Sequence, residues 1–505
     1  MSAAGPPQSA RPLRGKRRAA PHGGHHTNAA LLATSELSVI NVGVEAFTRS
    51  VRDAGGQALQ LDWRPPGDGD PALAWTLAQL AGDADDSACI GSRIDRANML
   101  AVERIIAAQP VLVDVAPHAR DVWPDMGRTL LHAGAPVGWQ RMCGPMQGAM
   151  IGALLYERWA ETPEAAEAML ARGDVRLAQC HDFDAVGPMS GIISPSMPVF
   201  VVRNQAHGNV AYTNMSEGIG RVLRFGANGP DVIERLRWIE TVLAPTLKVA
   251  VGDAGGIDLK AIQAQALLMG DEVHSRNTAA TLLFLAAIAA PLAGAVGDRA
   301  AVRETLEFVA GNSQFFLNLS MASAKATMVA AHGIDACSVV TAIARNGVTT
   351  AIRVSGLGSE WFEAPSDLPT GLFFPGFGPA DANADLGDSA ICETAGFGGF
   401  ALAASPALVQ LVGGTVQQAI AYSREMQEVA VARNPALSLP NLDFAGAPCG
   451  IDIRKVVDNG IRPMLTTGIA HKEAGIGQIG AGIVRTPMAC YASAVLALAQ
   501  RLDAQ

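Results

Sequence analysis

The pattern of apolar and polar positions changes its period several times along the chain. Between residues 37 and 115, apolar runs of strand length alternate with amphipathic segments of helical period. This order predicts strands joined by helices, so we expect a small, parallel, Rossmann-like α/β domain over residues 34–135. The segments are, in order, a strand at 37–43, a helix at 44–54, a strand at 58–66, a continuation at 72–80, a helix at 95–108 and a strand at 110–115.

The rest of the chain has a more mixed pattern. It predicts a helix at 149–159, strands and turns at 175–210, mostly helices at 258–344 with Asp258 and Asp298 as helix starts, a loop-rich section at 356–399, and an apolar helix at 487–502. The predicted fold is therefore α/β and α+β with several domains. The Rossmann-like domain is followed by a larger α+β and helical central region at 136–375 and by a mostly helical, loop-rich C-terminal part at 376–505.

One uncharged stretch, residues 278–297, approaches the length of a membrane span. It is rich in alanine and is interrupted by Pro291. We therefore expect a buried core helix that is broken at the proline, and we predict no membrane span.

Length and composition narrow the class of protein. A chain of 505 residues is too long for a single core, and 49% hydrophobic residues are enough to bury several. The net charge of −9 argues against nucleic-acid binding, which normally needs a basic surface. Residues 1–33 hold five basic and no acidic residues, with many Ala, Gly and Pro, and this composition predicts a disordered basic tail without the apolar core of a signal peptide.

The glycine-rich turns and the cysteines carry no recognisable cofactor motif. The seven cysteines are scattered and form no C-x-x-C pair, which favours a reducing cytoplasm over a disulfide framework or a zinc site. The first turn, at 41–43, lacks the dinucleotide fingerprint, and no Walker A sequence follows any glycine run. We expect neither a cofactor nor a metal.

Two glycine- and proline-rich stretches, 187–199 and 214–226, lie beside charged residues. If a helix begins at Glu217, its carboxylate shares one helix face with Arg221 and Arg224, at i, i+4 and i+7. Such a face is often only a solvated salt bridge. The glycine-rich entry favours the alternative, an anion-binding wall.

Three further clusters carry candidate chemistry. His181 precedes the Gly187 loop and suits proton transfer, whereas the adjacent Cys180 would point to the opposite face of a strand. Asp271 and His274, with Asn277, follow one another at i+3 steps, which places them on one broad helix face for capping or substrate binding rather than for metal. Lys325, seven residues after Asn318, needs an anion or a carboxylate as its partner if it is buried.

Taken together, the motifs resemble the AllG (YlbE-like) family over residues 37–495. The motifs are Asn41-Val-Gly with Asp62-Trp-Arg-Pro-Pro, Gly144-Pro-Met, Gly187-Pro-Met with Ser196-Met-Pro, Glu217-Gly with Leu223-Arg-Phe-Gly, Met269-Gly-Asp-Glu, Arg345-Asn-Gly, Gly387-Asp-Ser-Ala-Ile with Glu393-Thr, and Gly477-Gln-Ile-Gly-Ala-Gly.

The resemblance implies a subunit of an oxamate carbamoyltransferase that splits oxalurate with phosphate into oxamate and carbamoyl phosphate. It also implies an FdrA-type partner subunit and a third small subunit. We further expect a homo-oligomer and a small anionic substrate. The family offers no agreed catalytic set, so the candidates come from the motifs themselves. The candidate catalytic residues are His181, Glu217, Asp271 and His274. The candidate substrate- or phosphate-binding residues are Arg221, Arg224, Lys325, Asn204, Arg345, Asn346, Asp388, Glu393, Gly187 and Gly144.

A non-catalytic scaffold subunit is the alternative function. The two functions differ in what they require of the charged residues. Clustering of Glu217, Arg224, Asp271, Lys325 and Glu393 around one cleft would favour the enzyme, and dispersal over the surface would favour the scaffold.

Overall fold

The computed structural model describes residues 38–61, 64–82, 88–411 and 413–504 and divides into two compact units, one ending at Trp63 and the other beginning at Arg64. In the first unit, strand β1 (Ser38–Val42) pairs in parallel with strand β2 (Gln57–Leu61), and helix α2 (Glu45–Asp53) connects the two strands. The predicted strand, helix and strand are confirmed there. The predicted tail at 1–33 lies outside the described residues.

The strand predicted at 110–115 exists but has other partners than those expected. Strand β3 (Pro110–Ala116) pairs antiparallel with β8 (Val199–Asn204) and with β10 (Ile257–Asp258), in a five-stranded sheet of order β10-β3-β8-β9-β6 that also holds β9 (Val210–Asn214) and β6 (Ala185–Val186). The prediction that this strand completes a parallel N-terminal sheet is therefore wrong. An apolar run signals burial but does not say which strand it joins or in which direction. The domain boundaries at 135 and 375 stay predictions.

The larger unit also contains three smaller sheets and a two-stranded ribbon. Their strand orders are β5-β4-β7, β13-β12-β11-β15, β14-β19-β18 and β16-β17. Their strands are β4 (Thr129–His132), β5 (Arg176–Gln179), β7 (Ile192–Ile193), β11 (Val340–Asn346), β12 (Thr349–Val354), β13 (Phe362–Pro365), β14 (Thr370–Phe373), β15 (Leu386–Gly387), β16 (Ala430–Leu439), β17 (Ala445–Ile451), β18 (Met464–Ala470) and β19 (Gln478–Arg485).

Helices cover these sheets. They are α3 (Pro71–Ala81), α4 (Ile90–Ala107), α5 (Ala119–Val122), α6 (Gly144–Tyr156), α7 (Pro163–Arg172), α8 (Pro230–Trp238), α9 (Ala244–Asp253), α10 (Leu259–Leu268), α11 (Thr278–Ala295), α12 (Arg299–Ala310), α13 (Phe316–Ala330), α14 (Ile391–Thr394), α15 (Pro406–Leu411), α16 (Val416–Val429), α17 (Ile453–Asn459) and α18 (Met488–Asp503). The predicted C-terminal helix is thus confirmed. Asp258 and Asp298 cap α10 and α12 by accepting backbone N–H groups, as predicted.

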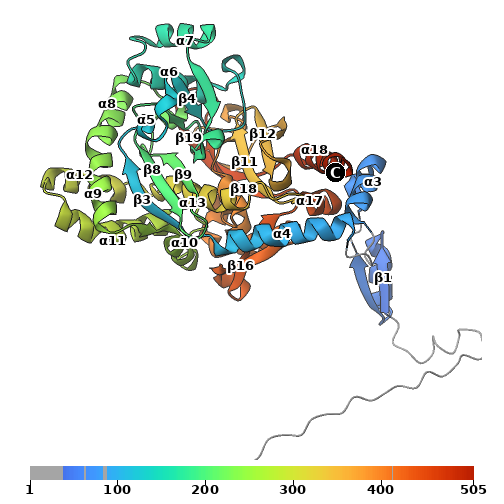
Figure 1. Ribbon diagram of the computed structural model, residues 1–505. Helices are drawn as coiled ribbons and strands as arrows, with labels where there is room; N and C mark the ends of the chain where they lie inside the picture. The colour runs from blue at the N-terminus through green and yellow to red at the C-terminus, as the bar shows by residue number, and fades with distance from the viewer. Residues whose placement is uncertain (1–37, 62–63, 83–87, 412, 505) are drawn as a thin grey trace, which may run out of the picture. The chain divides into compact units, whose positions relative to one another are not determined.

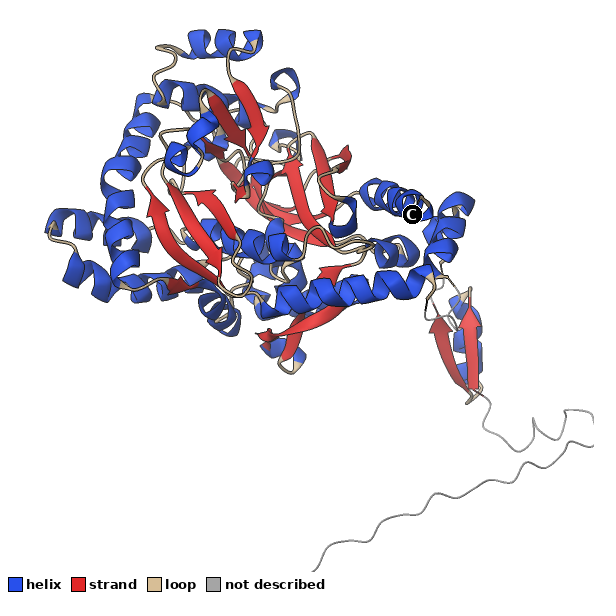
Figure 2. Ribbon diagram, in the orientation of Figure 1, coloured by secondary structure: helices blue, strands red, loops and turns tan. Residues whose placement is uncertain are grey.

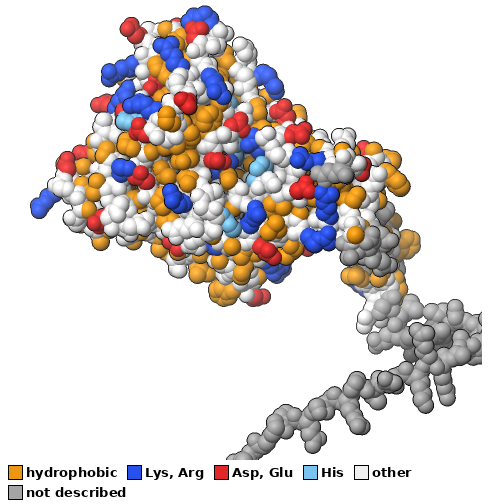
Figure 3. All heavy atoms as spheres, in the orientation of Figure 1, with side chains coloured by type: hydrophobic (Ala, Val, Ile, Leu, Met, Phe, Trp, Pro, Cys, Tyr) orange, Lys and Arg blue, Asp and Glu red, His pale blue; other side chains and the backbone are white. Residues whose placement is uncertain are grey.

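Helix α13 lies at the centre of the larger unit. Its residues from Phe316 to Met328 are all buried, and it packs against the five-stranded sheet on one side and β11 on the other. In Figures 1 and 2, helices α8, α9, α11 and α12 gather on the side of the five-stranded sheet that is remote from β11 and β12. On the face of the larger unit in Figure 3, basic and acidic side chains are interspersed, which gives that face no single sign of charge.

Helix α11 differs from the prediction in two ways. It continues through Pro291 instead of breaking there, and only a third of it is buried, with Leu282 half exposed. Among the described residues it is the one helix long and apolar enough to cross a membrane by length and composition, a test that core helices of soluble proteins also pass.

Candidate active site

A pocket of about 160 Å³ lies where loops from distant parts of the sequence meet strands β18 and β19. Its walls combine one cation, one histidine, neutral amides and hydroxyls, and apolar side chains. They are formed by Pro188, Met189, Arg224, Phe225, His274, Ser275, Gln314, Leu317, Phe374, Ser389, Leu408, Gly468, Gln478 and Ala481.

Arg224 reaches the pocket from a loop, and the helix predicted to begin at Glu217 is absent. Gly218 and Gly220 have positive φ angles of +95° and +96°, which a helix does not allow, and only a short 3-10 turn, η5 (Leu223–Phe225), follows. The prediction that Glu217, Arg221 and Arg224 share one helix face is therefore wrong. Arg221 is exposed to solvent.

The loop nevertheless brings Glu217 and Arg224 together. The Glu217 carboxylate accepts the backbone N–H of Arg224 at 3.1 Å, and the Arg224 guanidinium donates to the carbonyl of Gly218 at 3.3 Å. Burial raises the pKa of Glu217, and the charge of Arg224 opposes that rise. Arg224 is only 5% exposed, and its Nε has no hydrogen-bond partner among the described residues. A buried guanidinium with an unused donor beside a pocket suits an anionic ligand.

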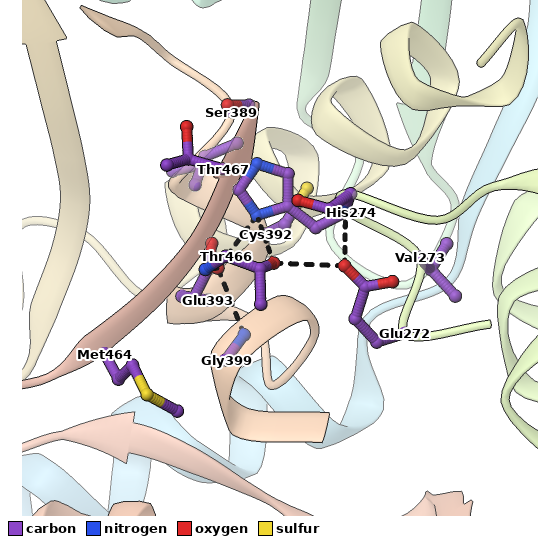
Figure 4. Close-up of polar contacts among 12 residues, drawn as sticks. Glu272, Val273, His274, Ser389, Cys392, Glu393, Gly399, Met464, Thr466 and Thr467 are labelled. Carbon is purple, nitrogen blue, oxygen red and sulfur yellow. Dashed lines mark hydrogen bonds and ion pairs between the residues drawn. The ribbon is translucent and has the colours of Figure 1, made fainter. Parts of the chain in front are cut away.

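His274 comes from the loop between α10 and α11 and is held by a buried carboxylate. Its Nδ1 lies 2.8 Å from Oε1 of Glu393, which is on α14. The same oxygen accepts the backbone N–H groups of Gly399 at 3.1 Å and Thr466 at 3.0 Å (Figure 4). With Nδ1 donating to Glu393, the Nε2 of His274 points away from that carboxylate and is available to a ligand in the pocket.

Gly398 makes this arrangement possible. Its φ angle is +59°, and a Cβ atom built there would lie 2.1 Å from the carboxylate oxygen of Glu393. Any larger residue would push Glu393 away from His274. Gly398 therefore serves close packing around this pair, while Gly396 and Gly399 pack against the carbonyls of Pro448 and Met464.

Glu272 lies behind the same histidine. It accepts the Thr466 hydroxyl at 3.0 Å and the backbone N–H of Arg276 at 2.9 Å, and it is fully buried. Burial raises the pKa of Glu272 to about 7, with the charge of His274 and these donors working in the opposite direction. Two carboxylates thus stand within one hydrogen-bond network around His274.

Asp271 has a structural role. One of its oxygens accepts the backbone N–H of Ala280 at the start of α11 and the other accepts the Nε of Arg276, both at 3.0 Å. The predicted helix face shared by Asp271, His274 and Asn277 is wrong, because residues 269–277 form a loop. The capping alternative is confirmed for Asp271, since it closes the N-terminus of a helix and lines no part of the pocket.

His181 and Asp388 form a second buried pair outside the pocket walls. Their side chains are fully buried, with Nε2 of His181 3.3 Å from Oδ1 of Asp388. Asp388 also accepts the backbone N–H groups of Gly134 at 2.7 Å and Gly187 at 3.0 Å. Burial would raise the pKa of Asp388, but His181 and these N–H groups outweigh it and lower that pKa. The N–H of Gly187, a candidate substrate-binding residue, is therefore already occupied by Asp388.

Lys325 is buried as predicted, and its partners are protein groups. Its Nζ lies 3.5 Å from the Asp184 carboxylate and donates to the carbonyl of His181 at 3.3 Å. Asn318, on the same helix, donates to the side chain and carbonyl of Asn214. Of the two alternatives for Lys325, pairing with a carboxylate of the chain is the one the structure shows.

The remaining candidates hold the backbone in place. Arg345 is fully buried, pairs with Asp385 at 2.8 Å and donates to the hydroxyl of Ser389 at 3.2 Å. Asn346 accepts two N–H groups in the turn between β11 and β12, Asn204 accepts those of residues 109 and 206, and Gly144 packs against the carbonyl of Lys472. None of these residues lines the pocket. Arg345 contacts the pocket wall indirectly, because Ser389, which accepts its hydrogen bond, lines the pocket.

Several pocket residues were not predicted. Ser275 and Ser389 each adjoin a predicted residue in the chain, so a wider window around His274 and Asp388 would have included them. Gln314 donates to the carbonyl of Ser275 at 2.7 Å, and Gln478 belongs to strand β19. Gln478 lies within the motif Gly477-Gln-Ile-Gly-Ala-Gly but was not singled out, because an uncharged amide gives no distinctive pattern, and the same is true of Gln314.

Comparison with known proteins identifies the family to which the chain belongs. A family model described as oxamate carbamoyltransferase subunit AllG matches residues 175–389. The AllG protein of Escherichia coli K12, named as an oxamate carbamoyltransferase subunit, is 50% identical over 412 residues, which are 81% of this chain and 98% of AllG. The uncharacterized protein YahG of the same strain is 45% identical over 471 residues, 93% of this chain and 98% of YahG. The crystal structure of a conserved protein of unknown function from Enterococcus faecalis V583 is 43% identical with a TM-score of 0.79, covering 81% of this chain and 98% of that one. The chain therefore belongs to the AllG family.

Proposed function

We propose that the chain is a cytoplasmic subunit of a carbamoyltransferase. Its reaction would be the phosphate-dependent cleavage of oxalurate, or of a related ureido acid, to carbamoyl phosphate and an amide. The observation that carries this proposal is that one pocket holds both a buried guanidinium, Arg224, and a histidine fixed by a buried carboxylate, His274 with Glu393. Membership of the AllG family supports the same reaction class.

Arg224 would bind the carboxylate of the ureido acid. A guanidinium presents paired donors that match a carboxylate, and a buried one does so without competition from water. Glu217 holds the backbone of Arg224 in place through the 3.1 Å hydrogen bond and compensates part of its charge. The amide side chains of Gln314 and Gln478 supply neutral hydrogen-bonding groups to the ureido end.

The transfer itself needs one new bond and one broken bond. An oxygen of hydrogen phosphate attacks the carbamoyl carbon, and the bond from that carbon to the inner nitrogen breaks. The phosphate proton ends on the leaving nitrogen, so oxalurate yields carbamoyl phosphate and oxamate with no net gain or loss of protons. Without protonation, the leaving nitrogen would depart as a poorly stabilised anion.

His274 would carry that proton. With Nδ1 donating to Glu393, the Nε2 of His274 can accept the proton from phosphate and pass it to the leaving nitrogen. The carboxylate of Glu393 stabilises the imidazolium that forms between the two steps. The Ser389 hydroxyl, which accepts a hydrogen bond from Arg345, lies in the pocket as a donor to the carbamoyl oxygen.

The scaffold alternative is less consistent with these contacts. Arg224 and His274 line the pocket, and Glu217 and Glu393 contact them directly, while Asp271 and Lys325 have structural partners elsewhere. A scaffold has no need of a buried cation with an unused donor. An FdrA-type chain and a third small chain are the partners we propose, in an assembly that contains more than one copy of this chain.

The test is an assay of carbamoyl phosphate in a reconstituted complex. The chain is purified together with the products of the adjacent genes and incubated with phosphate and a panel of ureido acids, oxalurate among them. We expect phosphate-dependent carbamoyl phosphate from at least one of them. No product from any member of the panel, with an assembled complex, would rule out the transferase function.

A further inference from the structure

Large apolar side chains remain exposed on the segments that carry or adjoin the residues of the candidate active site, and one of them, Phe374, lines the pocket itself. Five of them are between 38 and 58% exposed, although residues of this kind are normally buried. We call this set the mouth rim, and it consists of Ile219, Leu372, Phe374, Phe377 and Ile476.

The rim residues come from three segments that contact one another. Phe374 lines the pocket, and its N–H donates to the carbonyl of Ile479 in β19 at 2.8 Å. The ring of Phe377 stacks edge-on against His471 with 5.8 Å between ring centroids. Gly477 follows Ile476, and Gly220 follows Ile219. A Cβ atom built on Gly477 would lie 3.5 Å from the carbonyl oxygen of Gly220, so these two segments lie close together. The three segments that carry the rim residues therefore lie next to one another.

The pocket inside this rim has fewer cations than the proposed reaction needs. Among the described residues that line it, Arg224 is the one Lys or Arg side chain. The reaction transfers the carbamoyl group of a ureido carboxylate to a phosphate dianion, and both anions must be bound at once. Phosphate sites in proteins are usually built from further Lys or Arg side chains or from backbone N–H groups at a helix N-terminus. The pocket walls therefore offer one cationic side chain for two anions.

We propose that a second, different protein chain docks on the mouth rim and brings the phosphate-binding group to the pocket. The apolar rim would form the buried centre of the interface, as aromatic and aliphatic anchors commonly do. Docking would also exclude water from the pocket and so strengthen the contacts of Arg224 with its ligand. The inference rests on the proposed function and adds to it the place and the chemistry of the partner contact.

A second copy of this chain fits the rim less well. A copy would bring the same rim, with aromatic and aliphatic side chains, but it would offer no additional phosphate-binding cation from the pocket walls described above. The FdrA-type subunit of the proposed complex is therefore the partner to test.

The experiment uses two rim variants that do not touch the pocket, Ile219→Glu and Ile476→Glu. A charge placed in a buried apolar interface should weaken association with the FdrA-type subunit by about 10-fold or more. Loss of phosphate-dependent turnover should follow from the loss of the complex. Binding of the ureido acid to the isolated variant, measured by calorimetry, should match that of the parent chain.

Leu282→Glu is the matched control, since Leu282 is exposed to a similar extent but lies on α11, which contributes nothing to the pocket walls. It should change neither association nor turnover. Unchanged partner affinity in both rim variants would overturn the inference, as would phosphate binding by the isolated chain together with the ureido acid. Self-association of the parent chain that the rim variants abolish would also overturn it, in favour of a second copy. Association through the rim in a complex that makes no carbamoyl phosphate would instead reject the proposed function and leave the docking surface standing.

Discussion

Two buried carboxylates hold Arg224 and His274, the two ionisable side chains among the described residues that line the pocket. Glu217 accepts the backbone N–H of Arg224, and Glu393 accepts the Nδ1–H of His274 at 2.8 Å. In each case a carboxylate that is itself shielded from water fixes a side chain that meets the ligand. Such supporting contacts are worth more inside a protein than at its surface, because the local dielectric constant is lower.

Replacing His274 tests the role of this pair. We expect His274→Asn to lower kcat of the complex by about 100- to 10,000-fold with little change in KM, because the proton relay is lost while the anion site stays. Glu393→Gln keeps the shape of the side chain and should lower kcat less. The exposed His207 provides the control variant His207→Asn, which should match the parent in steady-state kinetics. If KM rises in both His274→Asn and Glu393→Gln while kcat stays unchanged, His274 acts in binding alone.

At the scale of elements, turns rather than helix faces assemble the site. Glu217 and Arg224 were predicted to meet as neighbours on a helix, and they meet because two left-handed glycines fold the loop back. The residue types were readable from the sequence, since a carboxylate and an arginine between glycines are conspicuous. The geometry was not, because an i, i+7 spacing fits a helix and a returning loop equally well.

The turn between β11 and β12 gives a sharp test of such packing. Gly347 has a φ angle of +78°, and a Cβ there would lie 2.6 Å from the Sγ of Cys143, whereas Gly333, at +79°, has open space around it. Gly333→Ala should cost about 1 kcal/mol of stability for its backbone conformation alone. Gly347→Ala should cost about 1 to 3 kcal/mol more because of the clash. Denaturant unfolding measures both, and equal losses would contradict the close approach.

At the scale of the whole molecule, local patterns could be read from the sequence and long-range pairings could not. The caps at Asp258 and Asp298 and the C-terminal helix are local features, and each was predicted. Strand β3 was placed in the wrong sheet because its partner β8 lies far along the chain. The pocket depends on the same kind of pairing, since β18 and β19 bring the C-terminal part against loops from the middle of the sequence.

The stability of the molecule should depend on pH through Glu272. Its pKa of about 7 in the folded state lies above the value of 4.5 expected without burial. Between these two pH values the folded chain retains a proton that the unfolded chain has lost, so stability falls as pH rises through the window, by about 3 kcal/mol from this group. Glu272→Gln should flatten that part of the profile, and exposed Glu167→Gln should leave it intact. Thermal unfolding between pH 4.5 and 7 measures this dependence. If the stability of Glu272→Gln falls with pH as steeply as that of the parent, Glu272 titrates normally.

Whether the pocket that holds Arg224 and His274 carries out carbamoyl transfer is best tested by comparing two arginine variants in the reconstituted complex. Removal of the buried Arg224 in Arg224→Ala should lower kcat/KM for phosphate-dependent carbamoyl phosphate formation by about 10- to 100-fold, because a charged hydrogen bond to the substrate is lost. Arg221→Ala, which removes an exposed arginine from the same loop, should stay within about two-fold of the parent. Equal activity in the two variants, with both complexes assembled, would contradict the account.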